Sequence, residues 1–319
     1  MSKKSIAIAG SILVDKINVI SAYPKEGELT QISKVTKAVG GCVPNVAIDL
    51  KKLSPSMDVY AVGLVGNDSD GEYATKTINS FGVDVSNVKV CEDNTSFTQV
   101  MSVDGGQRTF FTYAGASAQF GEKDVDFEKL NVDMLHLGYF LLLNKIDNGD
   151  GEKVLRKAKE RGVITSIDLV SENSDRYSLV LPCLKYVDNL IINETEASAL
   201  TGISPTQDNL VAIAQKLMEL GVSQRVIIHT PDQNVCVSKK GITTLSSYSL
   251  PSGFIKGTTG AGDAFCAGAL LMIAEEKSDK EILEFASGVA VTSLTEQDAV
   301  SGILEKSKVI EFCKGLKRK

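Results

Sequence analysis

A glycine-rich segment late in the sequence has the residue types needed to bind and transfer a phosphate. It runs Gly-Thr-Thr-Gly-Ala-Gly-Asp from Gly257 to Asp263 and opens a predicted helix over Ala261–Glu275. Small residues let backbone N–H groups converge, and the first N–H groups of a helix are unpaired and lie at the positive end of its dipole. The segment therefore predicts an anion-binding loop at a helix start.

Asp263 needs an explanation within this loop because a carboxylate repels phosphate. One interpretation is structural, since the helix dipole favours an acidic residue in the first turn. The other is catalytic: Asp263 takes the proton from a substrate hydroxyl while the neighbouring N–H groups stabilise charge on the transferring phosphoryl group. Taken alone, so short a motif leaves both interpretations open.

The elements that must position this loop alternate between short apolar runs and segments of helical periodicity. The predicted strands are Ser5–Ala9, Val59–Leu64, Met134–Leu137, Val163–Asp168, Asn189–Ile192 and Arg225–His229. The predicted helices are Asn45–Leu53, Gly71–Phe81, Lys153–Arg161, Ala261–Glu275, Lys280–Glu296 and Lys306–Lys317. This alternation predicts an α/β fold with a central, mostly parallel sheet flanked by helices on both faces.

Two stretches, residues 12–38 and 95–114, break the alternation. They are rich in Thr, Val, Ile, Phe and Tyr with polar residues interleaved, which is typical of strands. Each follows directly from a core element, so we expect one small β-sheet that forms a lid within a single domain spanning residues 1–319. A lid excludes water from the chemistry.

Composition limits the partners and the location of the protein. The chain has 319 residues, 43% of them hydrophobic and 23% charged, and a net charge of -6, so it lacks the basic surface that nucleic-acid binding needs. No run approaches the roughly 18 apolar residues of a membrane span. Six cysteines occur without CxxC or metal-ligand spacing, which suits a reducing cytoplasm.

The segment Gly257–Asp263 resembles the C-terminal signature of the ribokinase-like, or PfkB-type, carbohydrate kinases, Asp-Thr-x-Gly-Ala-Gly-Asp, at six of seven positions. Further segments similar to this family occur in the family's order over nearly the whole chain. The resemblance implies a ribokinase-like fold, Asp263 as catalytic base, and Gly260, Ala261 and Gly262 as the anion hole. It also implies ATP and Mg²⁺ as cofactors and transfer of the γ-phosphate to a hydroxyl of a small sugar.

The resemblance assigns the sugar site to the first half of the chain. Asp15, just after the first strand, matches an aspartate that binds substrate hydroxyls, and Gly40, Gly41 and Asn45 match the N-terminal signature. Without the resemblance, Asp15 reads as a turn residue and Asn45 as the N-cap of a helix. Arg108 lies in the predicted lid, where it could close on the substrate or be a solvated strand residue.

The nucleotide side is assigned in the same way. Asn193 and Glu196 resemble the family's Asn-x-x-Glu motif, which serves Mg²⁺ and its waters near the phosphates; the alternative is a capping box at a helix start. The residues predicted to contact ATP are Asn193, Thr230, Thr258, Gly260 and Gly262, and Glu196 is predicted to serve the metal.

Three segments depart from the family pattern. Gly257 replaces an aspartate that helps to hold a monovalent cation in relatives, and Thr295–Ala299 departs from the family near the carbonyls that bind it, so we expect little or no dependence on K⁺. Thr230–Asn234 replaces a glycine-containing loop beside adenosine. These departures keep a ligand-binding pseudokinase open as an alternative.

The substrate and the assembly also leave alternatives. Fructose-like or ribose-like sugars are the first candidates for the substrate, and a nucleoside is the second. A homodimer formed through the lid is one possible assembly. A dinucleotide-binding oxidoreductase is disfavoured because Ile8–Asp15 contains no Gly-x-Gly-x-x-Gly after the first strand.

Overall fold

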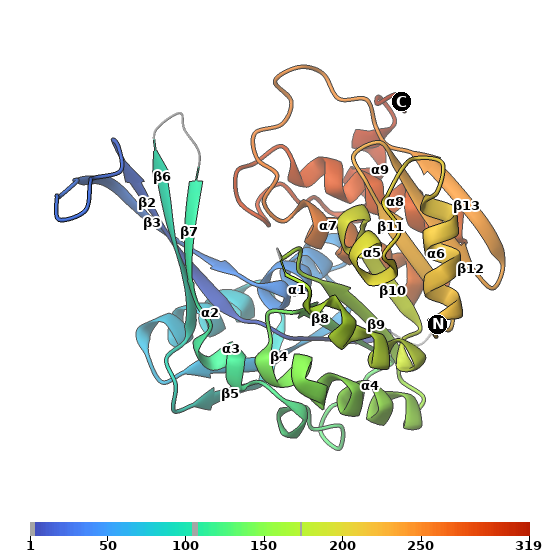
Figure 1. The fold of residues 1–319 in the computed structure, drawn as a ribbon, viewed down its shortest axis with the longest axis horizontal. Coiled ribbons are helices and arrows are strands. Elements are labelled where there is room, and N and C mark those ends of the chain that lie inside the picture. Colours follow the sequence, from blue (N-terminus) through green and yellow to red (C-terminus); the bar gives the residue numbers. More distant parts are fainter. Residues whose placement is uncertain (1–3, 104–107, 173) are drawn as a thin grey trace.

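The computed structural model describes residues 4–103, 108–172 and 174–319 and contains a nine-stranded sheet at its centre (Figure 1). Its strands are β1 (Ser5–Ala9), β4 (Asp58–Gly66), β5 (Asp84–Cys91), β8 (Met134–Phe140), β9 (Ile164–Leu169), β10 (Asn189–Asn193), β11 (Arg225–His229), β12 (Gln233–Ser238) and β13 (Gly241–Ser246). They lie in the order β13-β12-β11-β10-β9-β8-β1-β4-β5. Neighbouring strands from β5 to β11 run parallel, whereas β12 and β13 are antiparallel additions at one edge.

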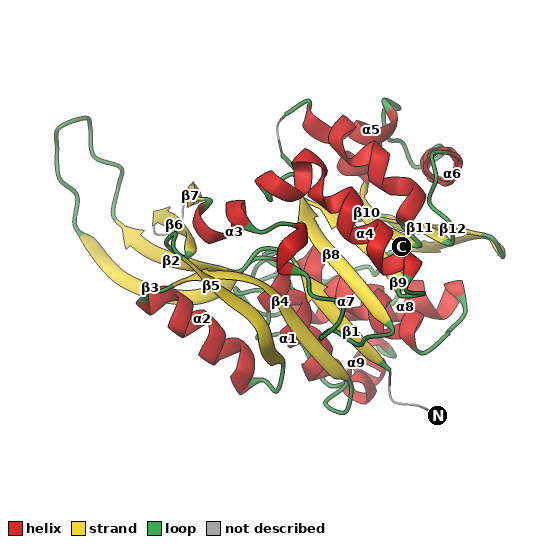
Figure 2. Ribbon diagram, turned by 90° about the horizontal axis from the view of Figure 1, so that it is seen from below, coloured by secondary structure: helices red, strands yellow, loops and turns green. Residues whose placement is uncertain are grey.

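Helices cover both faces of this sheet, as Figure 2 shows. They are α1 (Cys42–Leu53), α2 (Ser69–Ser80), α3 (Gly115–Gln119), α4 (Gly151–Glu160), α5 (Glu194–Thr201), α6 (Leu210–Glu219), α7 (Ala261–Ala274), α8 (Asp279–Ser293) and α9 (Lys306–Cys313). Further helical segments are η1 (Glu122–Asp124), η2 (Ile146–Asp150) and η3 (Arg176–Tyr186). The predicted α/β architecture is therefore confirmed.

The central strands are apolar throughout because both of their faces are buried. In β1, Ala7 and Ala9 join a core shared with α4, α5 and α6, while Ile6 and Ile8 join a second core shared with α1, α7 and α8. Alternate side chains of one strand thus serve two hydrophobic layers. The sheet is held rigidly between these layers, which fixes the positions of the loops at its carboxyl edge.

A separate four-stranded sheet projects to one side of the central sheet (Figure 1). It contains β2 (Leu13–Ile20), β3 (Ile32–Gly40), β6 (Ser96–Val103) and β7 (Arg108–Tyr113) in the order β3-β2-β6-β7. The strands come from the two stretches that the sequence sets apart, so the predicted small sheet is present. In the part of the chain that the structure describes, no helix is both long and apolar enough to cross a membrane.

Candidate active site

Two neighbouring cavities lie at the start of α7, the smaller at the carboxyl ends of β8, β9 and β10 and the larger at those of β10 and β11. The smaller cavity, of about 210 Å³, is lined by side chains that include Tyr139, Asp168, Asn193, Glu196, His229 and Asp263. The larger, of about 640 Å³, shares Asn193, His229 and Gly262 with the smaller one. Residues far apart in the sequence therefore meet at the carboxyl edge of the sheet, where open α/β sheets bind their ligands.

The loop before α7 has the backbone shape of an anion-binding helix start. Gly260 has a φ of 77°, and a Cβ atom there would lie 2.4 Å from the Cβ atom of Ala299, so only glycine fits. The N–H of Ala261 already donates to a carbonyl within the loop at 3.2 Å. Within the described residues no hydrogen bond uses the N–H of Gly262 or Asp263. These two groups are available to an anion at the positive end of the helix dipole.

Asp263 lies buried beside this loop with one oxygen engaged. Its Oδ2 accepts hydrogen bonds from Asn45 Nδ2 at 2.9 Å and from the Tyr139 hydroxyl at 2.8 Å, and no hydrogen bond within the described residues reaches its Oδ1. Burial, helped by the negative charge of Asp168 and opposed by these two hydrogen bonds, raises the pKa of Asp263 from 3.8 to about 7. A carboxyl group with such a pKa can exchange a proton near neutral pH.

The residues predicted to bind the sugar lie at the ends of β2 and β3 and in the first turns of α1. Gly40 packs so closely against Asp15 that a Cβ atom would lie 2.6 Å from the Asp15 carboxylate, and Gly41 has a φ of 92° with Ser11 equally close. Burial raises the pKa of Asp15 from 3.8 to about 6. The two glycines therefore permit close packing against Asp15 and Ser11, and their approach to the sugar stays a prediction.

The position of Asn45 in α1 rules out one interpretation of this residue. It lies inside α1, whose N-cap is Gly41, so the N-cap role considered for Asn45 is wrong. Its Nδ2 reaches Asp263, while its Oδ1 is buried and has no hydrogen-bond partner among the described residues. Arg108 begins β7, opposite Ser102 of β6, and its side chain lies outside the described part of the structure, so its contact with substrate stays a prediction.

Asn193 and Glu196 form the capping box that the sequence offers as the structural alternative. The Asn193 side chain accepts the N–H of Glu196 at 2.9 Å, and Glu196 Oε2 accepts the N–H of Asn193 at 3.1 Å. Glu196 Oε1 accepts from Ser171 at 2.8 Å, so both carboxylate oxygens are engaged. Burial raises the pKa of Glu196 from 4.5 to about 7. The same pair lines the smaller cavity, so capping and ligand binding are compatible.

Thr230 and Thr258 both line the larger cavity. Thr230 also shapes the turn after β11, because its hydroxyl donates to the Gln233 carbonyl at 2.8 Å and accepts the N–H of Asp232 at 3.1 Å. The loop expected over residues 230–234 is shorter than predicted, since Gln233 already begins β12. The antiparallel pairing of β11 with β12 leaves room only for a tight turn.

Comparison with known proteins places the chain in a family. The model of the pfkB family carbohydrate kinases matches residues 3–306. The chain belongs to this family. A ribokinase of Arabidopsis thaliana is 26% identical over 97% of this chain and 81% of its own length, and a probable chloroplastic fructokinase of the same plant is 25% identical over 95% and 80%.

A solved structure of a relative has the same fold as this pfkB kinase. The Arabidopsis thaliana ribokinase complexed with ribose and ATP superimposes with a TM-score of 0.85 at 24% identity, covering 98% of this chain and 99% of that one. The predicted ribokinase-like fold and the predicted carbohydrate kinase class are thus confirmed.

Tyr139 is a residue of the kinase's candidate site that sequence reasoning did not identify. It follows the straight part of β8 with a φ of 60°, a left-handed conformation that costs a tyrosine about 1–3 kcal/mol. Its N–H donates to Asp168 Oδ1 at 2.6 Å and its hydroxyl to Asp263 at 2.8 Å. An aromatic residue at a strand end reads as core in a sequence, so no signal marked it.

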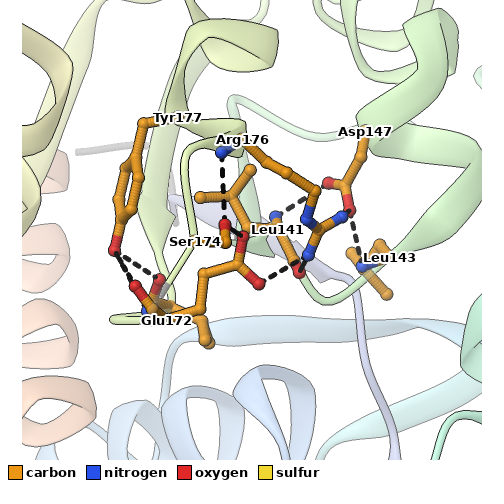
Figure 3. Close-up of polar contacts among 8 residues, drawn as sticks. Leu141, Leu143, Asp147, Glu172, Ser174, Arg176 and Tyr177 are labelled. Carbon is orange, nitrogen blue, oxygen red and sulfur yellow. Dashed lines mark hydrogen bonds and ion pairs between the residues drawn. The ribbon is translucent and has the colours of Figure 1, made fainter.

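The loops after β8 and β9 of the kinase are tied together by Arg176 (Figure 3). Arg176 donates to the Leu141 carbonyl at 2.6 Å and to the Glu172 carboxylate at 2.5 Å. Asp147 accepts the N–H groups of Leu141 and Leu143 at 2.8 and 3.2 Å, and its carboxylate lies 3.7 Å from Arg176. Leu141 itself has a φ of 77°, so these contacts hold a second left-handed residue in place.

Gly257 of the kinase lies against the backbone of the segment after α8. A Cβ atom at Gly257 would lie 2.9 Å from both the Cα atom of Gln297 and the carbonyl oxygen of Glu296. An aspartate therefore does not fit here unless the backbone moves. The loop has neither the carboxylate that the family resemblance assigns to K⁺ nor the space for one, so these residues do not fit that cation.

Proposed function

We propose that this kinase transfers the γ-phosphate of ATP to a hydroxyl of a fructose-like or ribose-like sugar, with Asp263 as general base. One observation carries the proposal. Asp263 is buried, its pKa lies at about 7, and it lies in the first turn of the helix whose free N–H groups can bind a transferring phosphoryl group.

Asp263 would accept the proton of the sugar hydroxyl at Oδ1, because Oδ2 is held by Asn45 and Tyr139. These two donors fix the carboxylate's orientation and stabilise its ionised form. The N–H groups of Gly262 and Asp263 would stabilise the charge on the transferring phosphoryl oxygens. The base and the anion-binding N–H groups thus lie at the same end of one helix, so the distance between them is fixed.

The larger cavity suits ATP, with its phosphates directed to the α7 loop and its base between apolar side chains. Ile255, Phe265 and Leu294 supply that apolar wall, and Thr230 and Thr258 supply polar groups. Mg²⁺, when bound, neutralises charge on the phosphate oxygens. Because both Glu196 oxygens are already hydrogen-bonded, Asn193 and Glu196 would hold the ion through its water ligands.

The sugar would lie between the smaller cavity and the lid sheet. Asp15, on β2, and the unpartnered Oδ1 of Asn45 offer hydrogen-bond acceptors for hydroxyl groups, and Gly40 and Gly41 let the Asp15 carboxylate and Ser11 pack closely beside them. Relatives named ribokinase and fructokinase support a small sugar. A nucleoside is the alternative substrate, and the test must distinguish it from a sugar.

The test measures ATP consumption by the unmodified protein with a panel of pentoses, ketoses and nucleosides. We expect at least one furanose or ketose sugar to be turned over faster than any nucleoside. A faster nucleoside would overturn the sugar assignment, and no turnover with any acceptor would identify a pseudokinase.

The role of Asp263 is tested by Asp263→Asn, with Asp84→Asn on the distant strand β5 as matched control. We expect Asp263→Asn to keep its fold and bind MgATP but lose roughly 10²–10⁴-fold in turnover, the usual contribution of a positioned base. Near-normal turnover in Asp263→Asn would remove this residue from the proposed role.

A further inference from the structure

Beside the smaller cavity lies a cluster of metal-ligating side chains to which the proposed phosphate transfer assigns no direct step. Cys42 comes from the start of α1, His136 from β8 and Asp168 from the end of β9. All three are buried, and one ligand atom from each lies within 4.8 Å of the others. Across residues 4–103, 108–172 and 174–319, no other trio of His, Cys, Asp or Glu side chains is close enough to share one ion.

The spacing of two of the three side chains matches that of ligands of one zinc-like ion. His136 Nε2 lies 3.4 Å from Asp168 Oδ2. Zinc bonds of about 2.0–2.1 Å to N and O give a tetrahedral N···O edge of roughly 3.3 Å. Cys42 brings its thiol within 4.8 Å of both ligand atoms, so three protein side chains can reach one ion.

Neighbouring residues hold the side chains of the cluster in place, as they do for metal ligands. The other ring nitrogen of His136, Nδ1, lies 3.2 Å from the Ser166 hydroxyl, which fixes the ring so that Nε2 faces the cluster. Gly138 makes space for the thiol, because a Cβ atom there would lie 1.9 Å from Cys42 Sγ. Asp168 also lines the smaller cavity, which gives an ion a path from solvent.

We propose that Cys42, His136 and Asp168 form a three-ligand binding site for a borderline-soft divalent cation of the Zn²⁺ class, with the fourth position left to water. Thiolate and imidazole ligands select such ions over Mg²⁺, which prefers oxygen. The site is therefore distinct from the one that serves the ATP phosphates. Binding releases the thiol proton of Cys42, because a coordinated sulfur is a thiolate.

The experiment titrates the reduced, chelator-treated protein with Co²⁺ alone, which reports on coordination by its absorption spectrum. We expect one equivalent to produce a sulfur-to-cobalt charge-transfer band and the intense visible bands of a tetrahedral site, and Zn²⁺ to remove them. Cys42→Ser and His136→Gln should abolish the tetrahedral spectrum. Ser166→Ala, which loses only the orienting hydroxyl, should weaken the affinity by roughly 10–100-fold.

Cys91→Ser is the matched control, since Cys91 ends β5 away from the cluster. It should keep the full spectrum. Circular dichroism and thermal unfolding establish that each variant is folded. If Cys42→Ser does not fold, His136→Gln tests the site in its place. No charge-transfer band in the unmodified protein would overturn the proposal, as would a band that survives in folded Cys42→Ser or disappears in Cys91→Ser.

Discussion

Asp263 combines burial, which disfavours its charge, with two hydrogen bonds that stabilise the charge. The donors are Asn45 and Tyr139, and the nearby charge of Asp168 acts in the opposite direction. Burial has the largest effect, so the pKa rises rather than falls. A base whose pKa lies near the working pH accepts a proton readily and is still ionised often enough to act.

The pKa of Asp263, about 7, predicts opposite pH trends for turnover and stability. Turnover should rise as the pH rises through about 7, because the general base that we propose acts in its ionised form. Stability should fall from about pH 4 to above 7, because the folded state holds this proton more tightly than the unfolded chain does. Asp263→Asn removes the effect and should be more stable than the parent above pH 7 by up to ~4 kcal/mol.

Unfolding by urea at pH 5 and pH 8, with both proteins measured side by side, checks the stability trend. Asp15 and Glu196 also have raised pKa values and contribute the same sign, so only the difference between parent and variant isolates Asp263. A difference that is the same at both pH values would contradict the prediction.

Tyr139→Phe tests whether the tyrosine tunes the base or only fills space. Its hydroxyl stabilises the ionised carboxylate of Asp263, so removing it should raise the pKa of that carboxyl group and shift the pH–turnover profile to higher pH. A hydrogen bond to a charged group is worth about 1.5–3 kcal/mol, so turnover at pH 7 should fall by roughly tenfold or more. A variant with altered stability but an unmoved pH profile would show a packing role alone.

Sequence reasoning reached part of this site and missed the rest for a physical reason. Asp263, Gly260 and Asn45 stand in local motifs whose spacing is visible in the sequence. Tyr139 and Asp168 do not, because their contacts form only when β8 and β9 pair side by side. Neither residue has a local pattern that distinguishes it from an ordinary strand end.

At the level of elements, the strands that are buried on both faces were predictable and the edge strands were not. β1, β8 and β10 read as continuous apolar runs, whereas β5 and β13 alternate with polar residues and face solvent in part. The lid strands were found because β-branched and aromatic residues cluster in them. The tie between the β8 and β9 loops was not foreseen, since Arg176 joins segments that only the fold brings together.

The loop before α7 predicts that activity depends little or not at all on K⁺. A cation bound by carbonyl oxygens gains much of its affinity from a nearby full negative charge, and Gly257 supplies none. Close packing of Gly257 on Gln297 and Glu296 makes Gly257→Asp a destabilising change rather than a simple gain of a site. The loop must therefore keep its shape by packing and local hydrogen bonds.

Initial rates in Na⁺-free Tris buffer, with and without KCl at matched ionic strength and saturating MgATP, provide the measurement. Rates with and without K⁺ should agree within about twofold. A large stimulation specific to K⁺ would contradict the prediction and point to Asp49, whose buried carboxylate on α1 has no hydrogen-bond partner within the described residues. Asp49→Asn would then be expected to abolish the stimulation.

At the scale of the whole molecule, the lid sheet has exposed apolar side chains that packing within one chain does not bury. Its edge strands are β3 and β7, and several of its large apolar side chains are exposed, among them Val35 at 66%, Phe110 at 61% and Phe111 at 56%. Open strand edges with apolar side chains favour association with another chain. A homodimer formed through the lid would cover them, and it would also hold β2, which carries Asp15, over the sugar site.

We therefore expect the protein to be a dimer in solution and Val35→Glu, on the edge strand β3, to make it a monomer. Burying a carboxylate in an apolar interface without a partner costs several kcal/mol, enough to dissociate a dimer at micromolar concentration. Ile242→Glu is the matched control, because Ile242 is 52% exposed on β13 at the far edge of the central sheet. Light scattering coupled to size-exclusion chromatography measures the mass.

Since the lid carries Asp15, the monomeric variant should show a raised KM for the sugar and a smaller change in KM for ATP. A parent protein that stays monomeric at high concentration, or a Val35→Glu variant that stays dimeric, would show that the lid does not form the interface.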